Sequence, residues 1–207
     1  MPSIYMLKPR FQNALRPSVR RLFDLGVTAN QTTLMTAAGS ILVGILVAVF
    51  VSQLWMFILV PIWMVVRMAL NAMDGMLARE FGQQSEIGVY LNELCDLVAD
   101  CALILPFLLI PDVSPALTLT TMLLAWLSEY AGVMGPIVGS TRRYEGPMGK
   151  SDRAFVFGAL ATGIALGWLD GGWVNTALVL VSALLSYTIY NRVRSGLKKA
   201  KECPSLA

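Results

Sequence analysis

Long apolar segments separated by short polar linkers make up most of the chain. The longest interval without Asp, Glu, Lys or Arg extends from Leu25 to Val66. A helix needs about 20 predominantly apolar residues to cross the hydrocarbon core of a bilayer, so this interval predicts most of two membrane-spanning helices. Hydropathy along the rest of the sequence extends the prediction to six spans, over residues 32–52, 54–80, 86–110, 115–140, 152–169 and 173–195.

The segment before the first predicted span has a different pattern. Apolar residues recur there at near-helical intervals with arginines between them, at Tyr5, Leu7, Phe11, Leu15, Val19, Leu22 and Phe23. This pattern predicts an amphipathic helix at the cytoplasmic membrane interface. A basic flank that only sets the topology is the alternative. We therefore divide one polytopic domain, residues 1–207, into an interfacial helix (1–25), a six-helix bundle (26–195) and a basic tail (196–207).

The composition agrees with an all-α membrane protein. Hydrophobic residues make up 56% of the chain and charged residues only 14%, with a mean hydropathy of +0.64. A soluble domain of this size needs more charge to cover its surface. The N-terminus has no pattern typical of a cleaved signal peptide, because the first apolar stretch begins too far into the chain.

The distribution of positive charge predicts the orientation. The linkers at 52–53, 111–115 and 170–173 contain no Lys or Arg, and nearly all of the 16 basic residues lie on the other side of the predicted membrane. The positive-inside rule then places both termini in the cytoplasm, as expected for a bacterial inner-membrane protein with an even number of spans. The sequence pI of about 8.9 follows from this topology and does not indicate a nucleic-acid partner.

Two residue types restrict the chemistry. The chain has no His, which excludes acid–base catalysis by imidazole and metal sites built on it. Its three cysteines form no C-x-x-C pair, and we interpret those in the apolar segment as buried small hydrophobic residues. A bound metal would therefore be a hard cation with oxygen ligands, such as Mg²⁺ or Mn²⁺.

Polar residues interrupt the second predicted span on one side. Asn71, Asp74 and Ala78 are spaced by three and four residues, so they share a helical face, with Gly75 and Arg79 beside them. Ionisable groups at membrane depth are costly and mark functional sites. Small residues alone would also suit close helix packing, but that explanation does not account for the acids.

A second polar stripe follows on the third predicted span. Gly88, Asn92, Asp96 and Asp100 are spaced by four residues. The short linker at 80–85 predicts antiparallel neighbouring helices, so the two stripes can face each other. Carboxylates buried together repel unless a cation lies between them, so this arrangement predicts a divalent-cation site.

The complete motif resembles the signature of the CDP-alcohol phosphotransferase family. The family pattern reads D-x-x-D-G-x-x-A-R, a spacer, and then G-x-x-x-D-x-x-x-D. Here the matching positions, with a spacer of eight residues, are Asp74, Gly75, Ala78, Arg79, Gly88 and Asp96. Two positions depart from the pattern, because Asn71 and Asn92 stand where the family has Asp. The segment Thr28–Leu34 also resembles the stretch that opens the first span in many relatives.

The resemblance implies a reaction. A CDP-alcohol, commonly CDP-diacylglycerol, binds with its diphosphate on Mg²⁺ or Mn²⁺, an acceptor hydroxyl attacks the β-phosphorus, and CMP leaves. It also implies a homodimer with six helices and an active site open to the cytoplasm.

The resemblance and the helical spacing together assign roles to the residues of the two stripes. Metal ligands are expected at Asp74 and Asp96, with Asn71, Asn92 and Asp100 assisting. Asp96 is also the candidate base. Small side chains let the nucleotide or its phosphates approach, and Arg79 can bind a phosphate in bidentate fashion; these nucleotide- and phosphate-binding positions are Gly75, Ala78, Arg79 and Gly88.

The two departures leave several functions open. Asn keeps an oxygen ligand but loses a charge, so an active enzyme, a one-metal variant and a binding-only pseudoenzyme that serves as a partner subunit all remain. Glu93 is the less suitable replacement, because it points about 100° away from Asn92 on an ideal helix. A transporter or lipid-handling protein would use the same cavity, although the chain shows no inverted repeat.

Basic residues outside the motif can each be interpreted as structural or as phosphate-binding. Arg67 and Glu129 are expected to form a buried ion pair, since buried charges need partners; contact between Arg67 and a phosphate is the alternative. Lys150 and Arg153 open the fifth predicted span, where a helix N-terminus with basic residues can bind the phosphate of an acceptor or a lipid. A positive-inside anchor is the other reading of these two residues. The acceptor alcohol itself stays open.

Overall fold

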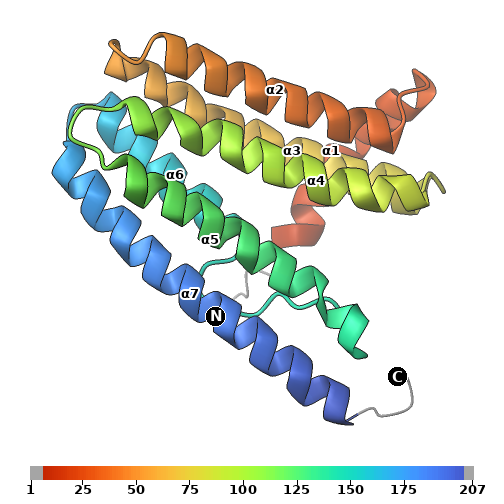
Figure 1. The fold of residues 1–207 in the computed structure, drawn as a ribbon. Helices are drawn as coiled ribbons and strands as arrows, with labels where there is room; N and C mark the ends of the chain where they lie inside the picture. The colour runs from red at the N-terminus through yellow and green to blue at the C-terminus, as the bar shows by residue number, and fades with distance from the viewer. Residues whose placement is uncertain (1–6, 203–207) are drawn as a thin grey trace. The chain divides into compact units, whose positions relative to one another are not determined.

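The computed structural model describes residues 7–202, and these residues form helices and loops without any strand. The predicted all-α class is therefore confirmed for the described part of the chain. The α-helices, labelled in Figure 1, are α1 (Leu7–Asp24), α2 (Ala29–Val49), α3 (Leu59–Glu80), α4 (Glu86–Ile104), α5 (Pro115–Val133), α6 (Lys150–Ala165) and α7 (Gly171–Glu202). Three short 3-10 helices are η2 (Leu54–Ile58), η3 (Leu105–Leu109) and η4 (Gly135–Val138).

Local sequence explains where these helices begin. The Ser114 side chain accepts a hydrogen bond from the Leu117 N–H at 3.4 Å, and Pro115 takes the first helical position of α5, where its missing N–H costs nothing. Helix α6 begins after Gly149, whose N–H donates to Asp152 Oδ2 at 2.9 Å. Both helices start at signals that the sequence provides.

Three stretches in the described part are long and apolar enough to cross a membrane. They are Ala29–Val49, Leu54–Glu80 and Gly171–Ala200, which correspond to the first, second and sixth predicted spans. The other three predicted spans form α4, α5 and α6. Helix α6 has 16 residues, or about 24 Å at 1.5 Å per residue, which is shorter than a hydrocarbon core of about 30 Å. The count of six spans stays a prediction.

The predicted N-terminal helix exists as α1, and its apolar side packs on other helices. Val19 is fully buried in a cluster with Ala29, Met76 and Leu77. Arg16 Nη2 also lies 3.0 Å from Glu80 Oε1 at the end of α3. Helix α1 is therefore part of the packed structure, while its position at a membrane interface stays a prediction. Tyr5 lies outside the described residues.

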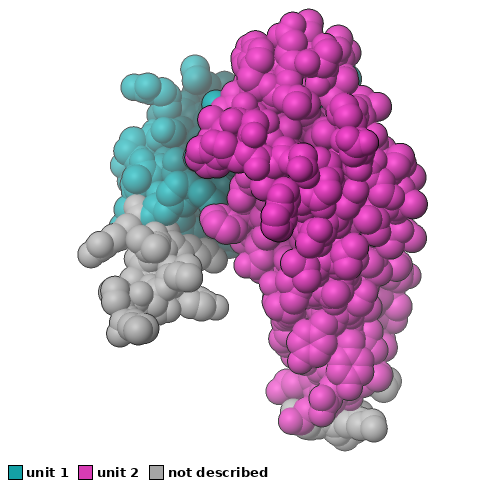
Figure 2. Space-filling model, turned by 90° about the vertical axis from the view of Figure 1, so that its left-hand side faces the viewer, with its two compact units in different colours: residues 1–46, 62–103 teal, residues 47–61, 104–207 magenta. Residues whose placement is uncertain are grey.

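The chain forms two compact units, which Figure 2 shows in different colours. Unit 1 comprises residues 1–46 and 62–103, and unit 2 comprises residues 47–61 and 104–207. Unit 1 contains α1 and most of α2, α3 and α4. Glycine allows close helix packing there, because a Cβ at Gly44 of α2 would lie 2.1 Å from the carbonyl oxygen of Ala102 in α4.

Unit 2 has its own core. Phe57, Phe107 and Phe157 are buried and stack edge to face, with ring centroids 5.3 Å and 5.6 Å apart. Helices α5 and α7 run side by side (Figure 1) and share a hydrogen bond of 2.8 Å between Thr121 Oγ1 and Ser182 Oγ.

Candidate active site

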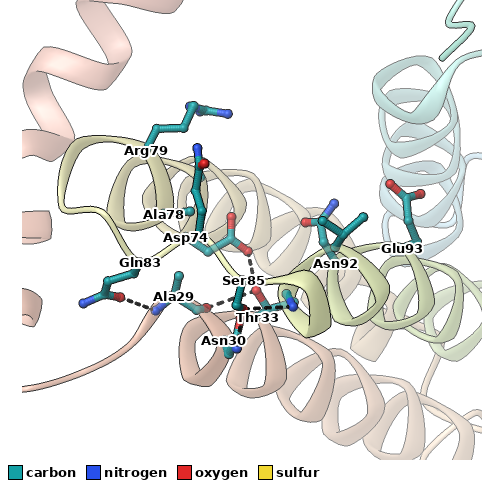
Figure 3. Close-up of a pocket in the computed structure, with 14 residues that line it drawn as sticks. Ala29, Asn30, Thr33, Asp74, Ala78, Arg79, Gln83, Ser85, Asn92 and Glu93 are labelled. Atoms are coloured by element: carbon teal, nitrogen blue, oxygen red, sulfur yellow. Dashed lines mark hydrogen bonds between the residues drawn. The ribbon is translucent and has the colours of Figure 1, made fainter. Parts of the chain in front are cut away.

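Unit 1 contains a pocket of about 460 Å³, a volume typical of small-ligand sites. The start of α2, the end of α3, the loop after it and the start of α4 form its walls (Figure 3). Its lining consists of Ala29, Asn30, Thr33, Asp74, Gly75, Ala78, Arg79, Gln83, Gln84, Ser85, Gly88, Val89, Asn92 and Glu93.

The pocket brings together six of the residues that the sequence singles out: Asp74, Gly75, Ala78, Arg79, Gly88 and Asn92. On α3 the spacing of three and four residues keeps their side chains on neighbouring parts of one face. On α4 the spacing of four does the same for Gly88 and Asn92. The short loop between Glu80 and Glu86 connects the two helices at this end.

Asp74 is the most enclosed acid of the pocket. It is only 5% exposed, and Thr33 Oγ1 lies 2.8 Å from its Oδ2 atom. The Thr33 hydroxyl also lies 3.1 Å from the Ala29 carbonyl oxygen, and its single proton serves one of these acceptors at a time. Sequence reasoning did not single out Thr33, although it lies in the Thr28–Leu34 segment that resembles the family.

The start of α2 holds the loop that closes the pocket. The Ala29 N–H donates to Gln83 Oε1 at 2.7 Å, and Asn30 Nδ2 donates to Ser85 Oγ at 3.2 Å. The same Ser85 oxygen accepts from the Gly88 N–H at 3.1 Å. These contacts fix the mouth of the pocket, and none of Gln83, Ser85 and Asn30 was assigned a role from sequence.

The two motif glycines give room to neighbouring side chains. A Cβ at Gly75 would lie 2.9 Å from Arg79 Nη2, and one at Gly88 would lie 2.8 Å from Asn30 Oδ1. The absence of a side chain at Gly75 thus allows the Arg79 guanidinium to pack against the preceding turn of α3. The sequence led us to expect this room for a nucleotide, and the structure shows that the protein's own polar groups share it.

Glu93, the less suitable replacement for the charge lost at Asn92, also lines the pocket. Two neighbouring rows of residues on α4 line the pocket. One row contains Gly88 and Asn92, and the other contains Val89 and Glu93. A separation of about 100° between neighbours therefore does not exclude Glu93. Figure 3 shows Asp74, Asn92 and Glu93 among the lining side chains.

The remaining motif residues form a network one turn further along the same helices. Arg67 Nη1 donates to Asp100 Oδ1 at 2.6 Å, and Arg67 Nη2 donates to Asp96 Oδ1 at 3.2 Å and to the Asp96 carbonyl oxygen at 3.1 Å. Asn71 Nδ2 donates to the same Asp96 Oδ1 at 3.1 Å. Asn71, Asp96 and Asp100 are not in the pocket lining.

The predicted pair of Arg67 and Glu129 is therefore wrong. Arg67 is 5% exposed and finds its carboxylates on the adjacent helix α4. Glu129 lies in unit 2, where Arg153 Nη1 is 2.9 Å and Arg192 Nη1 3.4 Å from its Oε1 atom, and Arg142 Nη2 is 3.6 Å from Oε2. Both charges were correctly expected to have partners, but each finds them within its own unit.

Arg153 and Lys150, the predicted phosphate-binding pair, lie at the start of α6 in unit 2. Arg153 is 3% exposed and contacts Glu129. Arg192, 2% exposed, belongs to the same cluster. Arg192 has no role predicted from the sequence, because no spacing pattern indicates its contact with Glu129.

The pocket has the donor atoms for a hard divalent cation. Among the described residues, no group of three or more His, Cys, Asp and Glu side chains is arranged for a metal. The pocket instead mixes the carboxylates of Asp74 and Glu93 with the carboxamide oxygen of Asn92. Such oxygens suit Mg²⁺ or Mn²⁺, so the residues present fit a divalent ion at the Asp74 end.

The fold and the motif define a family. The chain belongs to the CDP-alcohol phosphatidyltransferase family, whose model matches residues 27–184. The apolar helices and this family place it among integral membrane proteins.

Two relatives illustrate the family. Inner membrane protein YnbA of Escherichia coli strain K12 is 42% identical over 202 residues, which cover 97% of this chain and 99% of that protein. Archaetidylinositol phosphate synthase of Pyrococcus horikoshii is 25% identical over 169 residues, which cover 77% of this chain and 86% of that protein.

Solved structures share the fold. Two crystal structures of phosphatidylinositol phosphate synthase (PgsA1) of Mycobacterium tuberculosis, one with manganese and citrate and one with CDP-DAG, have a TM-score of 0.71 and 17% identity to this chain. Each match covers 87% of this chain, and the matches cover 87% and 92% of the two solved chains.

Proposed function

We propose that this protein transfers a substituted phosphate group from a CDP-alcohol, such as CDP-diacylglycerol, to an acceptor hydroxyl and releases CMP. The observation that carries the proposal is the pocket, which gathers Asp74, Gly75, Ala78, Arg79 and Gly88 of the family signature around one cavity. The structural relative with CDP-DAG bound supports a substrate of this class. The product would belong to phospholipid biosynthesis.

Arg79 and the small residues would hold the nucleotide. The Arg79 guanidinium lines the pocket and can bind the diphosphate through two parallel hydrogen bonds. Gly75, Ala78 and Gly88 have little or no side chain, so the nucleotide can approach the backbone of α3 and α4.

Asp74 would be the main ligand of Mg²⁺ or Mn²⁺, with Asn92 beside it. The further ligands predicted from the sequence, Asn71, Asp96 and Asp100, lie outside the pocket lining, where Arg67 pairs with both acids. The divalent ion supplies positive charge that stabilises the diphosphate and the leaving CMP. The manganese in one structure of the mycobacterial enzyme supports this choice of cation.

Asp96 would act as the base. The acceptor oxygen forms a bond to the β-phosphorus, its proton passes to the Asp96 carboxylate, and the bond from that phosphorus to the bridging oxygen breaks so that CMP leaves. Arg67 and Asn71 both donate to Asp96 Oδ1 and thereby orient the carboxylate.

Lys150 and Arg153 would bind a phosphate of the acceptor or of a lipid. Both residues lie in the first turn of α6, and the N-terminus of a helix with basic side chains favours an anion. We further propose cytoplasmic termini and a cytoplasmic active site in a bacterial inner membrane, and a homodimer. The positive-inside pattern supports the orientation, the name of the E. coli relative supports the membrane, and the family resemblance supports the dimer.

A binding-only partner subunit is the second candidate. The observation in its favour is that Arg67 already pairs with Asp96 and Asp100, while Asn71 and Asn92 replace two motif acids. Such a protein would bind CMP but release none from any CDP-alcohol.

The test is to measure CMP binding and CMP release on the same purified protein, with Mn²⁺ and CDP-diacylglycerol, against a panel of acceptor alcohols. The proposal expects CMP release that depends on one acceptor. Binding of CMP without release on any acceptor would favour the partner subunit, and absence of both would contradict the assignment of the pocket.

A further inference from the structure

The network beside the pocket already contains a cation of the protein itself. Asp96 and Asp100, whose side chains are 21% and 14% exposed, both pair with the Arg67 guanidinium. A divalent ion bound to the same oxygens would lie beside this buried positive charge and would be repelled by it.

Hydrogen bonds and ion pairs fix the position of the Arg67 side chain. This side chain is 7% exposed, and it reaches Asp100 at 2.6 Å and both the carboxylate and the carbonyl oxygen of Asp96. Moving it away would leave two carboxylates in the interior without their cation. The guanidinium thus occupies oxygens of Asp96 and Asp100 that would otherwise be available to a metal.

Asn71 fits this arrangement better than Asp would. Its amide donates to Asp96 Oδ1 at 3.1 Å, the oxygen that also accepts from Arg67. A carboxylate at position 71 would face Asp96 with like charge and would need a cation between them. Because Asn71 is one helical turn from Arg67, the two side chains act on the same carboxylate.

We propose that Arg67 is a built-in cation of this site that takes the place of a second divalent ion, so that each chain binds one divalent ion, at Asp74. This inference rests on the proposed metal-dependent function, and it assigns to Arg67 a role that the family signature does not contain. It also explains why Asn stands at position 71, where a carboxylate would need a second cation beside Asp96.

The experiment counts Mn²⁺ ions per chain on the full-length protein in detergent, by calorimetric titration in the presence of CMP. Wild type is expected to bind one ion. Asp74→Asn is expected to bind none and gives the baseline. The double variant Arg67→Gln with Asn71→Asp removes the guanidinium and restores an acid, and it is expected to bind two ions.

Two further variants keep the test decisive. Asn71→Asp alone retains Arg67 and is expected to bind one ion. Arg16→Gln removes an arginine that pairs with Glu80 outside the pocket lining, and it is expected to bind one ion with unchanged affinity. Two ions or none in wild type would overturn the proposal even if the double variant does not fold, and one ion in a folded double variant would do so as well.

The count does not depend on turnover, so the two proposals can fail separately. One ion per chain without CMP release keeps the role of Arg67 and contradicts the transferase. Acceptor-dependent CMP release with two ions per chain keeps the transferase and contradicts the role of Arg67.

Discussion

Asp74 lies within hydrogen-bonding distance of a hydroxyl from another helix. Its carboxylate is buried and accepts from Thr33 on α2, so a residue 41 positions away in sequence helps to orient the metal ligand proposed on α3. Hydrogen bonds to a ligating carboxylate orient it and tune its affinity for the ion. Thr33 is therefore a positioning residue of the proposed site.

Replacing Thr33 with Val keeps the shape of the side chain and removes this donor. We expect the Mn²⁺ concentration for half-maximal CMP release to rise by about 10-fold, in the range typical for partners of metal ligands. Thr36→Val is the matched control, because the Thr36 hydroxyl bonds only within α2, to the Thr32 carbonyl oxygen at 2.8 Å. Equal metal dependence in Thr33→Val and wild type would contradict the role of Thr33.

Gly75 makes room for Arg79, and adding a methyl group there tests the contact. In Gly75→Ala the new Cβ would lie 2.9 Å from Arg79 Nη2, which is the flexible end of a side chain and can move. Alanine also gains about 1 kcal/mol of helix propensity. We expect an unchanged or slightly higher Tm and a raised KM for the CDP-alcohol. A lowered Tm with unchanged KM would be the contradictory result.

Helices α2 and α4 approach each other closely within unit 1. The pair meets at Gly44, where the backbone of Ala102 leaves no space for a Cβ. Unlike a side-chain end, a helix backbone cannot move alone, so both helices would have to separate.

Gly44→Ala is therefore expected to lower the stability of the protein by about 1–3 kcal/mol, the usual cost of overpacking a core. Gly75→Ala is the matched control, since it adds the same methyl group at a helical glycine that faces a flexible side chain. Thermal unfolding in detergent measures both variants. The account is wrong on this point if Gly44→Ala melts at or above the Tm of wild type.

The helices and the pocket could be predicted from the sequence better than the ion pairs. Hydrophobic periodicity gave the helices, and spacing by three and four residues brought Asp74, Gly88 and Asn92 to the same pocket. The partners of Arg67 and Glu129 could not be predicted in this way, because several carboxylates and arginines stand within reach at similar helix positions. The presence of Glu93 in the lining could not be predicted, because an ideal helical wheel does not include the width of a cavity.

At the scale of the whole molecule, the account depends on a membrane topology with both termini in the cytoplasm. Reporter fusions test this directly. A reporter that is active only outside the cytoplasm should be inactive after residue 200 and active when inserted at Asp170, in a linker without Lys or Arg. Activity at both positions, or at the C-terminus alone, would contradict the predicted orientation and move the pocket to the other side of the membrane.

The central claim is that the Asp74 pocket transfers a phosphate group from a CDP-alcohol. The most direct measurement is acceptor-dependent CMP release from CDP-diacylglycerol by wild type, Asp74→Asn and Glu80→Gln. Glu80 is the matched control because it is an acid of the same helix that pairs with Arg16 and does not line the pocket. The account predicts release by wild type and Glu80→Gln and a loss of roughly 100-fold or more in Asp74→Asn. Equal release by all three proteins would contradict it.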